Sequence, residues 1–340
     1  MRLLAFLLII IVQQAFCQPA LQNKSLNVSS SLRGLSVVDD NVAWVSGSKG
    51  WVGISTDGGN NWKAKQVAGF EKYDFRSIYA FNAKTAIIAN AGTPANILLT
   101  TDGGVTWNVV YTNNDSAAFF DGIDFWNNNE GIIYGDPIKG KMMVLRTSDG
   151  GKSWKEPPAE SMSSLEKGEA SFAASGTAIR CIGNSKVVIA TGGIVSRLWI
   201  SANKGDTWDA LSTPILQGEA TTGIFSVAFS DERHAIIVGG DYKNESLQVN
   251  HVFTTEDGGY AWVPPFTPTG GYRECVEYIS KNTAIATGPR GTDITRDGGK
   301  KWEQLSADGF HVIRKSRKGN LILLAGTEGK IALLKTNTKH

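Results

Sequence analysis

The chain has 340 residues, of which 41% are apolar and 19% are charged, as in a folded globular protein. Its 34 basic and 32 acidic residues leave a net charge of +2, which excludes a global field that would attract nucleic acid or a membrane surface. The 38 glycines and 10 tryptophans favour turn-rich β structure with bulky packing anchors. Any charged binding surface must therefore be local.

The first 17 residues are typical of a secretory signal. Arg2 supplies the charged start, Leu3–Val12 is an unbroken apolar run, and the segment from Ala15 to Cys17 fits a small-x-small cleavage site. An N-terminal membrane anchor is the alternative, but the run is shorter than the roughly 20 apolar residues of a spanning helix. We therefore predict a signal peptide over residues 1–17, export to the periplasm or the extracellular space, and a single mature domain over 18–340 without a transmembrane span.

One eight-residue segment, Ser/Thr-x-Asp-x-Gly-x-x-Trp, recurs along the rest of the chain. Its copies are STDGGNNW (55–62), TTDGGVTW (100–107), TSDGGKSW (147–154), SANKGDTW (201–208), TEDGGYAW (255–262) and TRDGGKKW (295–302). Successive tryptophans are 45, 47, 54, 54 and 40 residues apart. A period of roughly 40–50 residues is typical of the four-stranded blades of a β-propeller.

The sequence between the copies divides into short apolar strands and polar turns. In Arg76–Thr112, for example, the strands RSIYAF, AIIAN, NILLTT and TWNVVY are separated by three turns. The tail Phe310–Lys335 gives three further strands, and Gln22–Ser30 holds one spare strand-like segment. We therefore predict an all-β, seven-bladed propeller whose last blade is closed by an N-terminal strand, which removes the exposed sheet edges of an open array.

The repeated segments have a structural interpretation. They lie between the third and fourth strands of a blade, where the Asp carboxylate and the Ser/Thr hydroxyl can accept from backbone N–H groups of a tight turn. The tryptophan opens the outer strand and can pack between blades. The residues given this role are Asp57, Trp62, Asp102, Trp107, Asp149, Trp154, Asn203, Trp208, Asp257, Trp262, Asp297 and Trp302. A calcium site is not expected, because the ladder of oxygens in an EF-hand loop is absent.

The six copies match the Asp-box (BNR) repeat of sialidases and of many non-enzymatic propellers. Over nearly the whole mature chain, the uniform TxDGGxxW form, the seven blades and the signal sequence resemble the photosystem II stability/assembly factor-like family of exported propellers. The resemblance implies an assembly factor that holds a membrane-protein subunit through an arginine-rich patch. It is specific for the fold and weak for function, because function on a propeller depends on grafted loops.

The innermost strands provide the candidate site. Aligning them places Arg33, Arg76, Asp121, Phe225 and Glu274 at equivalent positions, which would ring the mouth of the central channel. Neighbouring loops and chain segments add Lys49, Asp136, Asp241, Tyr242, Arg273 and Arg290. The arginine donor fork suits carboxylate or phosphate. We therefore predict a protein or peptide partner with acidic or carboxylate groups, contacted by Arg33, Lys49, Arg76, Tyr242, Arg273 and Arg290. A solvated rim with local ion pairs is the alternative.

A carbohydrate-active propeller, either glycan-binding or a sialidase-like hydrolase, is the rival function. It would use Asp136 and Asp241 as paired carboxylates. The Phe/Tyr-Arg-Ile-Pro segment of sialidases is missing, so we favour a non-enzymatic scaffold. No dinucleotide or phosphate-binding loop is present, and the four histidines lack metal spacing, so we expect no cofactor and no metal. We also expect a monomer that does not bind nucleic acid.

Overall fold

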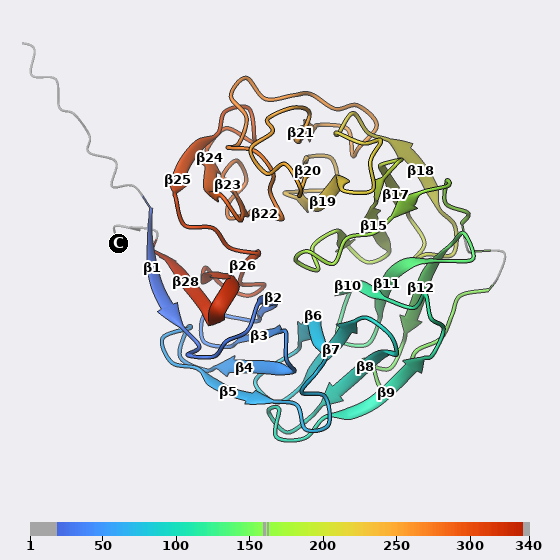
Figure 1. The fold of residues 1–340 in the computed structure, drawn as a ribbon, viewed down its shortest axis with the longest axis vertical. Coiled ribbons are helices and arrows are strands. Elements are labelled where there is room, and N and C mark those ends of the chain that lie inside the picture. Colours follow the sequence, from blue (N-terminus) through green and yellow to red (C-terminus); the bar gives the residue numbers. More distant parts are fainter. Residues whose placement is uncertain (1–18, 159–160, 162, 336–340) are drawn as a thin grey trace, which may run out of the picture.

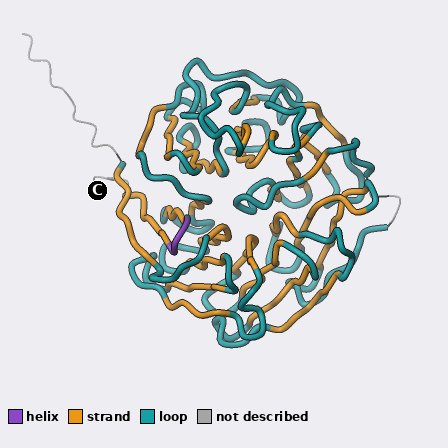
Figure 2. Tube along the Cα trace, in the orientation of Figure 1, coloured by secondary structure: helices purple, strands orange, loops and turns teal. Residues whose placement is uncertain are grey.

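The computed structural model describes residues 19–158, 161 and 163–335, so the signal-peptide prediction for residues 1–17 lies outside the described part. The sheets form a ring around a common central axis, as Figure 1 shows. Strands and loops make up almost all of the described residues, which also include the short 3-10 turn η2 (Thr327–Gly329) (Figure 2). No helix of those residues is long and apolar enough to cross a membrane.

The ring has seven blades, numbered here along the chain. Blade 1 contains β2 (Leu32–Val37), β3 (Ala43–Gly47), β4 (Trp51–Ser55) and β5 (Lys63–Gln66). Blade 2 contains β6 (Asp74–Ala80), β7 (Ala86–Ala91), β8 (Ala95–Thr100) and β9 (Asn108–Asn113). Blade 3 contains β10 (Phe120–Phe125), β11 (Gly131–Ile138) and β12 (Lys141–Thr147). Blade 4 contains β14 (Ile179–Ile182), β15 (Lys186–Ala190), β17 (Arg197–Ser201) and β18 (Asp209–Ser212).

Blade 5 contains β19 (Thr222–Phe229), β20 (Ala235–Asp241) and β21 (Val252–Thr255), extended by β13 (Glu169–Ala170) and β16 (Gly192–Gly193). Blade 6 contains β22 (Cys275–Tyr278), β23 (Ala284–Gly288), β24 (Gly291–Thr295) and β25 (Glu303–Ser306). Blade 7 contains β26 (Val312–Lys315), β27 (Ile322–Ala325), β28 (Lys330–Lys335) and β1 (Ala20–Ser25). The strand pairs within the blades are antiparallel, and in blades 1, 2, 3 and 6 consecutive strands pair in chain order as a meander.

The ring closes as the sequence predicts. The N-terminal strand β1 pairs antiparallel with the C-terminal strand β28, from Ala20 opposite Lys335 to Ser25 opposite Lys330. In Figure 1 these are the blue and red strands that lie side by side. The seven-bladed, all-β prediction with a composite last blade is confirmed. Closure joins the two ends of the chain in one sheet, which leaves no gap in the ring.

The fourth, outermost strand is irregular in two of the blades. In blade 3 the outer strand is reduced to two isolated bridges, Lys141 with Ser164 and Arg146 with Lys155, and in blade 5 to one between Thr254 and Val263. Prolines follow in both places and remove the N–H groups that a longer outer strand would need. These prolines are Pro157, Pro158, Pro264 and Pro265.

The repeated segments form tight turns held by their own side chains. In blade 1, Ser55 Oγ donates to Asp57 Oδ1 at 2.9 Å and accepts from the N–H of Gly59 at 2.9 Å. Asp57 also accepts from the N–H of Asn61 at 2.9 Å, and the Trp62 indole donates to the Gly59 carbonyl at 3.1 Å. Gly59 has φ +79°, which glycine adopts without strain. Equivalent hydroxyl and side-chain oxygen contacts recur in the other five copies.

The hydrophobic core lies largely between neighbouring blades. Trp44 of blade 1, for example, is buried against Ile88 and Leu98 of blade 2. Its ring also meets that of Trp107 edge-on, with centroids 6.2 Å apart. Burial of this kind fixes each blade against the next. The inner strand ends that surround the channel are therefore held on a rigid frame.

Candidate functional site

A cavity of about 560 Å³ lies at one mouth of the central channel. Its lining comes from the starts of the inner strands, from blade connections, and from loops between second and third strands. No residue of the six repeat turns lines it. Its lining side chains fall into four sets: Arg33 with its partners, Arg76 with its partner, the carboxylates of blade 3, and a set of aromatic rings.

Local backbone irregularities aim several side chains into this cavity. The pairing of the first two strands shifts register between Leu32 and Gly34, Asp74 and Ser77, Phe120 and Gly122, and Ile224 and Ser226. The residues at these bulges include four that line the cavity, namely Arg33, Arg76, Asp121 and Phe225. A bulge leaves its extra residue outside the ladder and redirects its side chain. Blades 1, 2, 3 and 5 thus present unlike side chains from equivalent backbone positions.

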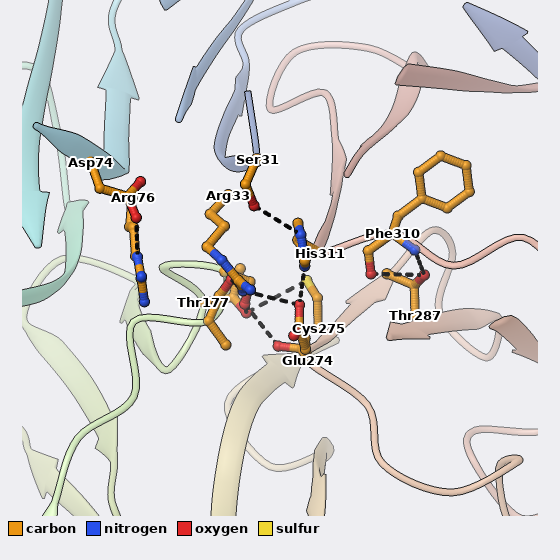
Figure 3. Close-up of polar contacts among 12 residues, drawn as sticks. Ser31, Arg33, Asp74, Arg76, Thr177, Glu274, Cys275, Thr287, Phe310 and His311 are labelled. Carbon is orange, nitrogen blue, oxygen red and sulfur yellow. Dashed lines mark hydrogen bonds and ion pairs between the residues drawn. The ribbon is translucent and has the colours of Figure 1, made fainter. Parts of the chain in front are cut away.

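Arg33 is part of a hydrogen-bonded group that spans the channel. Its Nη1 donates to the Ala174 carbonyl at 2.7 Å and lies 3.2 Å from Glu274 Oε2. The same carboxylate oxygen is 2.5 Å from Nδ1 of His311, whose Nε2 lies 3.0 Å from Ser31 Oγ. Figure 3 shows these side chains converging from blades 1, 6 and 7. Ala174 belongs to the connection before β14, which therefore reaches across the channel. The charge of Arg33 is largely committed to Glu274.

Arg76 is more open. Its Nε donates to Asp74 Oδ2 at 2.8 Å (Figure 3), and its side chain is 33% exposed. Among the described residues, none accepts from its two terminal nitrogens. Because those nitrogens carry the parallel donors that bind a carboxylate in bidentate fashion, Arg76 can hold an anionic group without first breaking its existing ion pair.

Blade 3 supplies the carboxylates. Asp121 is 1% exposed, and neither of its oxygens has a hydrogen-bond donor in the described part of the chain. Burial and the neighbouring Asp136 raise the pKa of Asp121 well above its usual value, and Arg76 offsets part of this rise. Asp136 accepts from the N–H of Ser171 at 3.1 Å, and burial raises its pKa too. Behind them the buried hydroxyl of Tyr134 also lacks a partner among these residues.

Aromatic rings form the remaining wall. Phe172 and Phe225 stack almost in parallel, with centroids 4.0 Å apart and planes at 8°. Tyr242 meets both rings edge-on, and Tyr272 meets Phe225 edge-on at 4.8 Å. Tyr242 is 43% exposed, whereas Phe225 and Tyr272 are buried. The wall is rigid at its base and accessible at Tyr242.

Some of the sequence-predicted site residues line the cavity, others lie outside it, and one, Arg273, is buried. Arg33, Arg76, Asp136 and Tyr242 line the cavity, as do the aligned residues Asp121, Phe225 and Glu274. Lys49, Asp241 and Arg290 do not line it. Lys49 and Arg290 are exposed on neighbouring loops. The pair Asp136 and Asp241, considered for hydrolysis, therefore does not share this cavity.

Arg273 requires a correction. It was expected at the partner-binding rim, but its side chain is only 1% exposed and its Nε donates to Asp293 Oδ2 at 2.7 Å. Its Nη1 donates to the Tyr272 carbonyl at 2.8 Å. A buried guanidinium with these partners braces blade 6 and cannot reach a ligand at the surface.

The sequence analysis did not single out several lining residues, including His311, Phe172, Glu245 and Tyr272. His311 precedes the first strand of blade 7 at the position that Arg33 holds in blade 1, so extending the strand alignment to the blade without a repeat turn would have found it. Phe172, Glu245 and Tyr272 lie on loops and connections outside any strand. Neither periodicity nor the repeat gives their position.

Two stretches of the chain, residues 14–115 and 90–213, match the model of the family described as "Photosynthesis system II assembly factor YCF48". Together they span residues 14–213, which is 200 of the 340 residues. The chain belongs to this family. The family resemblance inferred from the repeats is thereby confirmed. No curated protein matches the chain in sequence.

Solved structures of the YCF48 family share the fold. "YCF48 from Cyanidioschyzon merolae" is 16% identical with a TM-score of 0.68, and the match covers 93% of this chain and 98% of that one. "YCF48 bound to D1 peptide" is 17% identical with a TM-score of 0.66, covering 93% and 97%. The GH74 enzyme from Niastella koreensis is 12% identical with a TM-score of 0.61, covering 90% of this chain and 52% of that one. At these identities the likeness shows the fold alone.

Proposed function

We propose that the chain is an exported, non-enzymatic scaffold of the YCF48 family that binds a peptide segment of a protein partner in the channel-mouth cavity. The partner would be a component of an envelope complex during its assembly or maintenance. Export is inferred from the pattern of residues 1–17. Peptide binding is supported by family membership and by the solved structure of a propeller of the same fold, YCF48, bound to D1 peptide.

The observation that carries the proposal is the state of Arg76. Its side chain lines an open cavity, and its terminal nitrogens have no acceptor in the described residues. A side-chain or terminal carboxylate of the partner would complete those hydrogen bonds. Tyr242 and the stacked Phe172 and Phe225 would cover the apolar part of the segment, because aromatic surfaces contribute much of the binding energy in such sites.

Hydrolysis by Asp136 and Asp241 gains no support. The two carboxylates come from blades 3 and 5 and are separated by blade 4, and only Asp136 lines the cavity. A glycosidase requires its two carboxyl groups to flank one bond, roughly 5–10 Å apart. The GH74 structures share the propeller, and a shared propeller does not carry chemistry with it.

A crosslinked pull-down from the host envelope tests the proposal. Wild-type protein is compared with Arg76→Gln and with Arg146→Gln, whose residue is similarly exposed and pairs with Asp206 at 2.6 Å outside this cavity. We expect a specific partner whose capture falls at least about tenfold in Arg76→Gln and is unchanged in Arg146→Gln. A double variant, Asp74→Asn/Arg76→Gln, checks that the loss does not come from leaving Asp74 unpaired.

Two results would overturn the proposal. One is equal capture by wild type and by both Arg76 variants at matched melting temperature. The other is the absence of any protein captured above the level of an unrelated propeller. Either result would show that Arg76 does not bind a partner at this mouth of the channel.

A further inference from the structure

The ion pairs of the cavity are unbalanced. Each arginine already has a carboxylate, since Arg33 lies 3.2 Å from Glu274 and Arg76 lies 2.8 Å from Asp74. Asp121 and Asp136, in contrast, form no ion pair with any described residue. The lining contains two arginines and four acids, the fourth acid being Glu245. The lining therefore holds more carboxyl groups than arginines, and two of these carboxyl groups lack an ionic partner there.

Asp121 is the group that most needs a partner. It is 99% buried (1% exposed), it lines the cavity, and both of its oxygens lack a donor within the described ranges. The Tyr134 hydroxyl next to it is equally buried and unpartnered there. Leaving a buried polar group without a hydrogen bond costs about 1–3 kcal/mol, and more when the group is charged. Such groups are expected where a ligand completes the contacts.

The surroundings favour an organic cation over a metal ion. The described residues contain no group of three or more His, Cys, Asp or Glu side chains placed to hold a metal. The acids instead adjoin an aromatic surface: Ser171, whose N–H binds Asp136, is followed directly by Phe172, which stacks on Phe225. Carboxylates beside aromatic rings suit the methylene stem and charged head of a lysine or an arginine.

We propose that Asp121 and Asp136 form a pocket for the ammonium or guanidinium group of the bound segment, next to the Arg76 site for its carboxylate. This inference rests on the proposed function and specifies its ligand. The inner strands β6 and β10, which carry Arg76 and Asp121, are neighbours in the ring. The two ligand charges must therefore be neighbours as well. The segment recognised is one in which a basic residue lies close to an acidic residue or to the C-terminus.

Affinity selection from a random peptide library tests this. The peptides have free C-termini and acetylated N-termini, so that lysine and arginine supply all their positive charge, and the retained peptides are identified by mass spectrometry. We expect the wild type to enrich peptides with a lysine or arginine near a carboxylate. Asp121→Asn and Asp136→Asn should lose the basic residue and keep the carboxylate, and Arg76→Gln should do the reverse. Asp206→Asn, at a residue that pairs with Arg146 outside the cavity, is the control.

Replacing the lysine of the best peptide with norleucine provides the quantitative test. Affinity should fall about tenfold for the wild type and less than twofold for Asp121→Asn, since removal of one partner of a close charge pair removes most of its coupling. Enrichment of acidic peptides without basic residues, or unchanged selection by both Asp variants, overturns the cation pocket and leaves peptide binding intact. Failure of the wild type to enrich any peptide overturns the proposed function itself.

Discussion

Aspartates in two regions of this propeller have opposite environments. In the repeat turn of blade 2, Asp102 accepts from the hydroxyl and the N–H of Thr106, and these hydrogen bonds lower its pKa to about 2. At the channel mouth, Asp121 accepts from no described residue, and burial raises its pKa well above the ordinary value. The turn aspartate is satisfied by its own segment, whereas the mouth aspartate is buried without a donor among the described residues.

The difference separates residues that build the fold from residues that, in the proposed function, contact a ligand. Five of the six repeat turns carry an aspartate with the same contacts, because each blade needs the same turn. At the bulges of the inner strands, equivalent positions carry arginine, aspartate or phenylalanine. Identity among repeats is explained by turn chemistry. Variation at one structurally equivalent position produces a surface with specific chemistry.

The largest expected effect on stability comes from a substitution in one of the repeat turns. Trp154 is 6% exposed, its indole donates to the Gly151 carbonyl at 3.2 Å, and its ring meets Phe125 edge-on at 6.0 Å. Trp154→Ala should lower the free energy of unfolding by about 3–5 kcal/mol, because it leaves a cavity between blades 2 and 3. Urea denaturation measures the loss. Peptide binding by the folded fraction should be unchanged, and a loss below about 1 kcal/mol would contradict the role of Trp154 as an anchor.

The mouth side of the comparison is tested by pH. Because the pKa of folded Asp121 is raised above the ordinary 3.8, folding binds a proton at pH values between the unfolded and folded pKa. Wild-type stability therefore decreases as pH rises through this window, by about 1.4 kcal/mol per pH unit at most. The charged groups on the packed strands are Asp74 and Arg76 on β6, Asp136 on β11 and Arg180 on β14. Asp121→Asn lacks this dependence, so its free energy of unfolding relative to that of the wild type should increase from pH 4 upward.

Asp102→Asn is the matched variant of opposite sign. The lowered pKa of Asp102 stabilises the wild type above pH 3.8, and this contribution disappears as pH falls toward about 2. Chemical denaturation of the three proteins over a pH series measures both effects. Parallel pH profiles for wild type and Asp121→Asn would show that Asp121 finds a partner in the free protein and would contradict its description as unpaired.

The same contrast explains what the sequence could predict. The fold could be predicted because the repeat turn marks six blades, and the alternation of strand and turn supplies the seventh. Aligning the inner strands also brought Arg33, Arg76 and Asp121 to one mouth. This succeeded because equivalent positions in a ring of similar blades occupy equivalent places in space.

Other features of the site have no local signal in the sequence. Arg273 adjoins an aligned position, but its orientation is decided by Asp293, twenty residues away on β24. Phe172 reaches the cavity on a connection that folds across the channel, where no strand period applies. The absence of a donor near Asp121 is a property of the packed structure. The sequence therefore indicated which residues surround the cavity better than it indicated how their charges are paired.

The smallest expected effects on stability concern the repeat turns, where one of the six copies already carries a different residue. Asn203 replaces aspartate in the fourth copy, where its Oδ1 accepts from the N–H of Thr207 at 2.9 Å and its Nδ2 donates to the Thr207 hydroxyl at 3.0 Å. In the third copy Asp149 Oδ1 accepts from the N–H of Ser153 at 3.0 Å, and Oδ2 accepts from the Ser153 hydroxyl at 2.6 Å. The two turns differ mainly in which side chain donates.

Asp149→Ala should therefore cost about 1 kcal/mol, because backbone donors of the turn lose their acceptor. Asp149→Asn should cost less than half of that, since Oδ1 remains and the Ser153 hydroxyl can rotate to accept. The reverse change, Asn203→Asp, should shift the free energy of unfolding by no more than about 0.5 kcal/mol. Denaturant midpoints resolve this order. If Asp149→Asn were as destabilising as Asp149→Ala, the negative charge itself would hold the turn, and Asn203 would need another stabilising contact in blade 4.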